Sequence, residues 1–102
     1  METGALVIVS CCSPREKLWG VLLALTPAGA TVRGVRLDAF EEWLRGQARG
    51  EAAAIGPATV FFPAHRVERI ELDESSAAVE GFGDRFRRVA RREPRGAVLG
   101  AG

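Results

Sequence analysis

The stretch VFFPAHRVERI, residues 60–70, decides the fold that this sequence predicts. Apolar and aromatic residues that favour strands stand on both sides of a short interruption, Pro63–Arg66. Proline ends the first strand because it lacks the N–H that a sheet ladder requires. The few residues that follow leave room only for a tight or 3₁₀ turn. The stretch therefore predicts two short strands, 59–62 and 67–72, joined by an abrupt corner.

Three more strands are expected upstream of this corner. The β-branched run from Ala5 predicts a strand that continues to about Cys12. Residues 17–25 predict a second strand that is apolar on both faces, which is typical of a strand buried on both sides or strongly curved. Gly20 in its middle marks a bend or a close approach between backbones. A turn at residues 26–29 then leads into a return strand over residues 30–37.

Two helices complete the predicted secondary structure. Asp38 and Glu41 have the spacing of a capping box, which predicts a helix over about residues 38–50, inserted between the third and fourth strands. One stripe of this helix is apolar and is expected to dock on the strands. The stripe contains Phe40, Trp43 and Leu44. A C-terminal helix is expected over about residues 83–92, within an appendage that spans residues 82–95, and Pro94 is expected to end it.

Composition indicates one ordinary globular domain. The chain has 102 residues, of which 47% are hydrophobic and 26% charged. No apolar run approaches the ~20 residues that a membrane-spanning helix needs, so we expect a cytoplasmic protein without a membrane partner. The two cysteines, Cys11 and Cys12, are too few for a disulfide framework or a zinc site. We therefore expect no metal and no cofactor.

Charge is unevenly distributed along the chain. The net charge is only +1, yet six arginines and only three acidic residues lie in residues 75–102. Basic helices bind phosphate backbones, anionic lipid or acidic partners, and they also form plain solvated faces. The arginine run leaves these interpretations open.

Five short strands with a tight turn before the last strand resemble the Sm-like superfamily, which includes Lsm and Hfq-type proteins. Residues 18–25, LWGVLLAL, are similar to the second strand of the family with its central glycine. Residues 60–70 are similar to its closing signature, in which a histidine-containing turn joins two apolar strands. The resemblance implies a mainly β protein, a small five-stranded Sm-like or SH3-like barrel over about residues 5–73. It also implies a homo-oligomer, such as a ring, formed through strand edges.

The nucleotide pocket of the family is largely missing. Thr26 and Ala30 stand where the family has an Asp and, in many members, an Asn, and Ala28 stands where a stacking aromatic is expected. Of the Hfq-type turn only His65 remains. Recognition of single-stranded RNA needs stacking platforms and cationic groups. We therefore expect a non-catalytic protein-interaction or assembly module with a protein partner, and the alternative is an Sm-like RNA-binding protein.

The sequence offers candidates for RNA contact but none for catalysis. A single histidine without a nucleophile, a carboxylate pair or a metal partner has few catalytic options. The same residues also fit a structural histidine and solvated ion pairs. The candidate nucleic-acid-binding residues are His65, Arg66, Arg87, Arg88, Arg91 and Arg92.

Overall fold

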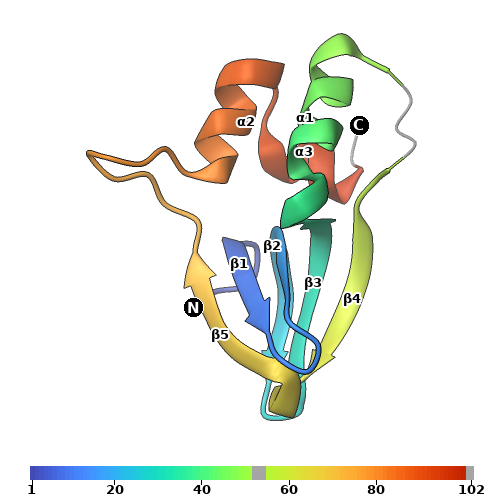
Figure 1. Ribbon diagram of the computed structural model, residues 1–102, viewed down its shortest axis with the longest axis vertical. Coiled ribbons are helices and arrows are strands. Elements are labelled where there is room, and N and C mark those ends of the chain that lie inside the picture. The colour runs from blue at the N-terminus through green and yellow to red at the C-terminus, as the bar shows by residue number, and fades with distance from the viewer. Residues whose placement is uncertain (52–54, 101–102) are drawn as a thin grey trace.

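The computed structural model describes residues 1–51 and 55–100 of the chain (Figure 1). Five strands form one antiparallel sheet in the order β4-β3-β2-β1-β5. The strands are β1 (Leu6–Cys11), β2 (Glu16–Thr26), β3 (Gly29–Arg36), β4 (Ala58–Pro63) and β5 (Val67–Leu72). The prediction of a mainly β fold with five strands is confirmed.

The sheet is curled but not closed. The predicted corner is a 3₁₀ turn, η2 (Ala64–Arg66), and β4 and β5 diverge from it along opposite margins of the sheet (Figure 1). No strand pairing joins β4 to β5 over the described residues, so each is an edge strand. The expected five-stranded barrel is therefore not confirmed, because the sheet is open and curved with two free edges.

Two glycines explain how tightly β2 and β3 approach each other. Gly20 and Gly34 are direct cross-strand partners. A Cβ atom on Gly20 would lie 2.2 Å from the carbonyl oxygen of Arg33, and one on Gly34 would lie 2.0 Å from that of Trp19. The close backbone approach predicted at Gly20 is thus confirmed, and a side chain at either position would force the two strands apart.

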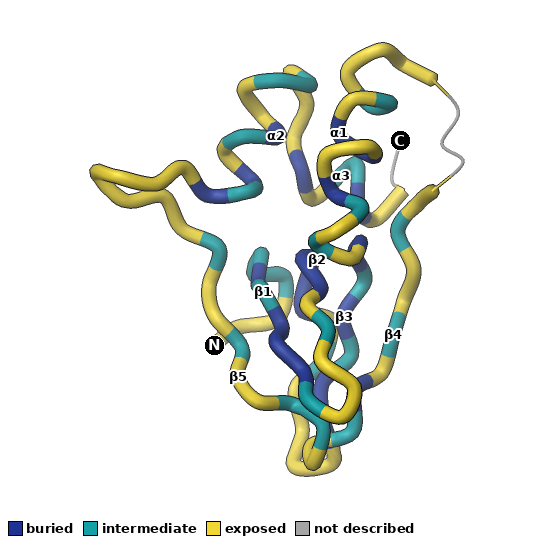
Figure 2. Tube along the Cα trace, in the orientation of Figure 1, coloured by how far each residue is buried: buried dark blue, intermediate teal, exposed yellow. Residues whose placement is uncertain are grey.

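The sheet has an apolar core on each face. The first core, on the inner face of the curl, contains Val7, Val9, Cys11, Leu18, Leu22, Ala30, Val32 and Phe62. The second core lies between the outer face and the helices, and it contains Trp19, Val21, Val35, Phe40, Trp43, Leu44, Phe86 and Val98. Buried positions follow the three central strands, whereas β4 and β5 are mostly exposed (Figure 2). β2 carries apolar side chains on both faces, so a core on each side of the sheet is needed to bury them.

The helices gather over one end of the sheet (Figure 1). They are η1 (Leu37–Ala39), α1 (Phe40–Arg49), α2 (Phe82–Ala90) and α3 (Pro94–Leu99). The apolar stripe of α1 docks as predicted, and its Trp43 ring stacks on Phe86 of α2 with 5.0 Å between ring centroids. The inserted helix and the C-terminal helix are thus confirmed in kind, within a few residues of their predicted bounds.

Two expectations about helix ends are wrong. Asp38 does not cap α1, because the chain first forms η1 and Ala39 takes the N-cap position without a side-chain hydrogen bond. The Asp38 carboxylate instead lies 3.2 Å from the Arg36 guanidinium. Pro94 does not end the helical region, since it occupies the first turn of α3, where a missing N–H costs nothing. Val98 of α3 is fully buried against the outer face of the sheet.

Candidate functional site

The free edge of β4 presents backbone groups at two residues. The Ala64 N–H donates to the Ala28 carbonyl oxygen over 2.9 Å. Along an antiparallel ladder, residues alternate between pairs that exchange hydrogen bonds and pairs whose backbone groups point away. With Phe62 opposite Ala30, this alternation directs the N–H and C=O of Thr59 and Phe61 away from β3. The Phe61 side chain is 52% exposed beside them.

The free edge of β5 has a matching arrangement. The Asp73 N–H donates to the Leu6 carbonyl oxygen over 2.9 Å. Because Leu72 is opposite Val7 in the next pair, the same alternation turns the backbone groups of Ile70 and Leu72 away from β1. The molecule therefore carries two unpaired edges, each with an exposed apolar side chain, Phe61 on β4 and Leu72 on β5.

At the corner between these edges, the two predicted site residues differ in role. His65 is exposed, and its ring has no hydrogen-bond partner over residues 1–51 and 55–100. Arg66 is half-buried, and its guanidinium donates to the carbonyl oxygens of Cys12 and Pro14 and to the Glu16 carboxylate, at 3.3, 3.0 and 2.9 Å. The hydrogen bond to Glu16 raises the pKa of Arg66. Arg66 thus fastens the corner to the β1–β2 loop.

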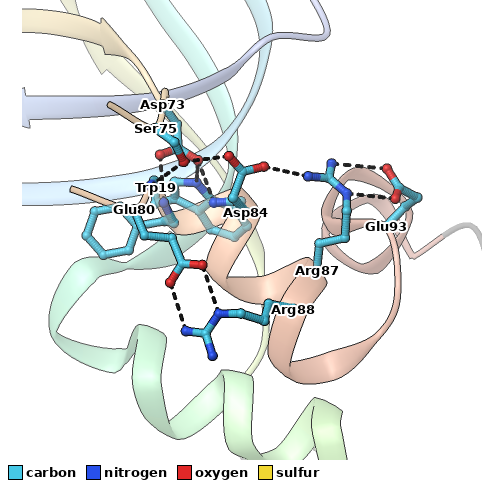
Figure 3. A network of polar contacts seen from close by, with 11 residues as sticks. Trp19, Asp73, Ser75, Glu80, Asp84, Arg87, Arg88 and Glu93 are labelled. Carbon is cyan, nitrogen blue, oxygen red and sulfur yellow. Dashed lines mark hydrogen bonds and ion pairs between the residues drawn. The ribbon is translucent and has the colours of Figure 1, made fainter. Parts of the chain in front are cut away.

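The predicted arginines of the C-terminal helix are mostly engaged with acceptors of the chain itself (Figure 3). Arg87 contacts Asp84 at 2.6 Å and Glu93 at 2.8 Å, and Arg88 forms a two-pronged pair with Glu80 at 2.8 and 2.9 Å. The hydrogen bond from Arg88 lowers the pKa of Glu80, and the bond from Arg87 lowers that of Glu93.

The last two arginines of this set follow α2. Arg92 donates to the side-chain oxygen of Gln47. Arg91 is exposed and lacks an ion-pair or hydrogen-bond partner for its side chain within the part of the chain that the structure describes. The corner with His65 and the helical layer with these arginines lie at opposite ends of the molecule (Figure 1). The structure therefore does not gather the six predicted residues into one site.

A polar centre that the sequence did not reveal lies at Asp73 (Figure 3). Its carboxylate accepts hydrogen bonds from the Trp19 indole N–H at 3.0 Å and from the backbone N–H groups of Phe82 and Gly83 at 2.8 and 2.6 Å. Asp73 therefore caps α2 from the end of β5 and ties the helix to β2. Capping signals in a sequence are local, whereas this cap stands nine residues before the helix.

Other chemistry is sparse in the described parts of the chain. Over residues 1–51 and 55–100, no three His, Cys, Asp or Glu side chains lie close enough together to hold a metal ion. No helix in those residues is long and apolar enough to cross a membrane. Cys11 and Cys12 are both free, and burial raises the pKa of the Cys11 thiol, which disfavours its reactive thiolate form.

Comparison with known proteins gives no relative. No protein-family model, no curated protein and no solved structure matches this chain. The function must therefore be argued from the strand edges and the charged groups themselves.

Proposed function

We propose that this protein is a non-catalytic, Sm-like assembly module whose copies join through the free edges of β4 and β5. The observation that carries the proposal is that one sheet has two unpaired edges with complementary outward backbone groups. If β4 of one copy receives β5 of the next copy in antiparallel fashion, Thr59 pairs with Leu72 and Phe61 with Ile70. Each of these residues then exchanges its free N–H and C=O groups.

Burial supports the same arrangement. Val60, Val67 and Ile70 are only half-buried, although they pack against the inner core. A strand from a second copy would cover this margin of the core, together with the exposed side chains of Phe61 and Leu72. Unprotected edge strands readily pair with other chains, so this pairing also removes an aggregation risk. Because β4 and β5 are different surfaces, the contact is head-to-tail. Such contacts form a closed ring when the rotation that relates neighbouring copies is a whole fraction of a full turn.

The RNA-binding alternative has less support from the arrangement of charges. Arg66, Arg87 and Arg88 already contact carboxylates of the chain. His65 stands apart from the helical arginines, with no neighbouring aromatic group in the sequence of its turn. Stacking and free cationic groups are what single-stranded RNA recognition requires.

The test is the solution mass of the protein and of two variants at one position, measured by light scattering. Thr59→Pro removes the outward N–H of β4 without removing a hydrogen bond to β3, since Thr59 belongs to an outward-facing pair. Thr59→Ala is the matched control, because both variants lose the hydroxyl that accepts a 3.3 Å hydrogen bond from Arg33. We expect a multiple of 10.9 kDa for the wild type and for Thr59→Ala, and a monomer for Thr59→Pro.

Circular dichroism should show that all three proteins are equally folded. A wild-type protein that remains monomeric at high micromolar concentration would overturn the proposal. So would a Thr59→Pro variant that keeps the full mass of the assembly.

A further inference from the structure

A second set of cations, separate from the predicted one, meets on the outer face of the sheet. Ser10 of β1 is directly opposite Lys17 of β2 on one side and Arg69 of β5 on the other. Directly opposed residues of a sheet share one face, with Cβ atoms about 5 Å apart. A short side chain is thus flanked by two long cationic ones. Lys17 and Arg69 are both exposed, whereas Ser10 is only 5% exposed.

The Ser10 hydroxyl lacks an acceptor. It is buried, and it has no hydrogen-bond partner within the part of the chain that the structure describes. Leaving a buried polar group unsatisfied costs about 1–3 kcal/mol, so such a group calls for a physical explanation. The ammonium of Lys17 and the guanidinium of Arg69 are donors only and cannot accept its proton. Neither flanking residue can therefore satisfy Ser10, and no other described residue does so. The acceptor for this hydroxyl is left to a ligand that enters between Lys17 and Arg69.

The surrounding charges favour an anion. Arg15, Lys17 and Arg69 line the same hollow as Ser10, together with two acidic residues, Glu16 and Glu68. Glu16 is already neutralised by Arg66 at 2.9 Å, which leaves Glu68 in the lining and Glu71 beside Arg69 as the opposing charges.

Two of these cations are free to bind. Over residues 1–51 and 55–100, Arg15 and Lys17 form no ion pair. Arg69 pairs with Glu71 at 3.1 Å, but the two side chains are 61% and 46% exposed. This exposed contact uses a single nitrogen, unlike the two-pronged contacts of Arg85 and Arg88, so it is weak and can exchange for a ligand.

We infer that this hollow binds a phosphate group. A phosphate offers several acceptor oxygens, so it can take hydrogen bonds from the Ser10 hydroxyl, Lys17 and Arg69 at once, with Arg15 adding charge from the β1–β2 loop. Ser10, Lys17 and Arg69 come from adjacent strands of one copy, so the site does not require assembly. The phosphate group belongs either to a small molecule or to the backbone of a nucleic acid.

The site is tested by titrating ¹⁵N-labelled protein with sodium phosphate at constant ionic strength, followed by amide chemical shifts. Saturable shifts are expected at Ser10, Lys17 and Arg69. Ser10→Ala removes one hydrogen bond to a charged ligand and should weaken binding by about tenfold. The double variant Lys17→Gln with Arg69→Gln should abolish it. Arg91→Gln, which removes an exposed arginine at the other end of the molecule, is the control and should bind like the wild type.

Further titrations distinguish the two sources of phosphate. Adenosine monophosphate that binds at least as tightly as inorganic phosphate would assign the site to a small phosphorylated ligand. An oligoribonucleotide that binds more tightly, and loses binding in the double variant, would assign it to a nucleic-acid backbone. The inference fails if phosphate causes no more change than chloride, if the shifts do not saturate, or if both Ser10→Ala and the double variant bind like the wild type.

Discussion

The arginines of α2 and the cations around Ser10 are similar side chains in different settings. The first set binds carboxylates of the chain, and the second set lies around a hydroxyl that has no partner among the described residues. Arg85, Arg87 and Arg88 are clustered in sequence, and each forms short contacts to carboxylates of the chain itself. Lys17 and Arg69 are 52 positions apart in sequence, yet the sheet places them on either side of one buried hydroxyl. A dense run of charge in a sequence therefore does not locate the charge that is free to bind a ligand.

The difference has a simple structural cause. Each arginine of α2 finds an acidic partner close by, either in its own segment or on α1. Glu80, Asp84 and Glu93 belong to the same C-terminal segment. Glu41 of α1 accepts two hydrogen bonds from Arg85, at 2.7 and 2.8 Å. The cross-strand neighbour that Lys17 and Arg69 share is an uncharged serine, and among the described residues Arg69 has only one exposed contact, to Glu71 at 3.1 Å.

The largest expected effect comes from breaking the helical layer at Asp73. Asp73→Ala removes the acceptor of the Trp19 indole N–H and of two N–H groups at the start of α2. Losing these bonds and the helix cap should cost about 3 kcal/mol of unfolding free energy. The melting temperature should then fall by roughly 10 °C or more, as measured by calorimetry.

Two companion variants show whether the loss is specific to this carboxylate. Asp73→Asn keeps one acceptor oxygen and should fall between the wild type and Asp73→Ala. Glu74→Ala changes the adjacent exposed acid and should leave the melting temperature unchanged. If Glu74→Ala destabilises the protein as much as Asp73→Ala does, the cap is not what secures α2.

The elements that sequence reasoning predicted well are those determined by local patterns. Residues 60–70 contain apolar runs on both sides of Pro63, and they form two strands about a 3₁₀ turn. Gly20 was expected at a close approach, and its partner Gly34 lies directly across from it. Local rules failed where neighbours distant in sequence decide the outcome, as at Pro94, which begins a helix whose Val98 is buried on the sheet.

The binding residues were harder to predict, because their roles depend on strand register. Arg66 stood out in the sequence as a cation beside His65, but it is held by two carbonyl oxygens and Glu16. Ser10 gave no signal at all, since a serine in a strand is ordinary. Only the pairing of β1 with β2 and with β5 brings it between Lys17 and Arg69.

The two cation sets should also differ in their contribution to stability. Arg85→Gln breaks a two-pronged contact that links α2 to α1, and should lower the free energy of unfolding. Lys17→Gln removes a charge without an ion pair and should change stability by less than about 0.5 kcal/mol. Urea unfolding gives the free energy of unfolding of both variants. The same measurement on Glu41→Gln, alone and combined with Arg85→Gln, gives the coupling energy between Glu41 and Arg85. A coupling energy of zero between Glu41 and Arg85 would show that this contact does not secure the helices.

The smallest expected effect is a difference in acid sensitivity. Hydrogen bonds from arginines lower the pKa values of Glu41, Glu80 and Glu93 below the ordinary 4.5. In the unfolded chain these carboxyls protonate first, so their stabilising contribution is complete above about pH 4.5 and is lost as pH falls through the lower folded values. Arg85→Gln combined with Arg88→Gln should reduce this dependence, because two of the three carboxyls then lose their partners. Lys17→Gln combined with Arg69→Gln should change it less, since Lys17 has no carboxylate partner and Arg69 shares only an exposed pair with Glu71. Melting temperatures measured from pH 3 to 6 give the comparison, and equal slopes for the two double variants would contradict it.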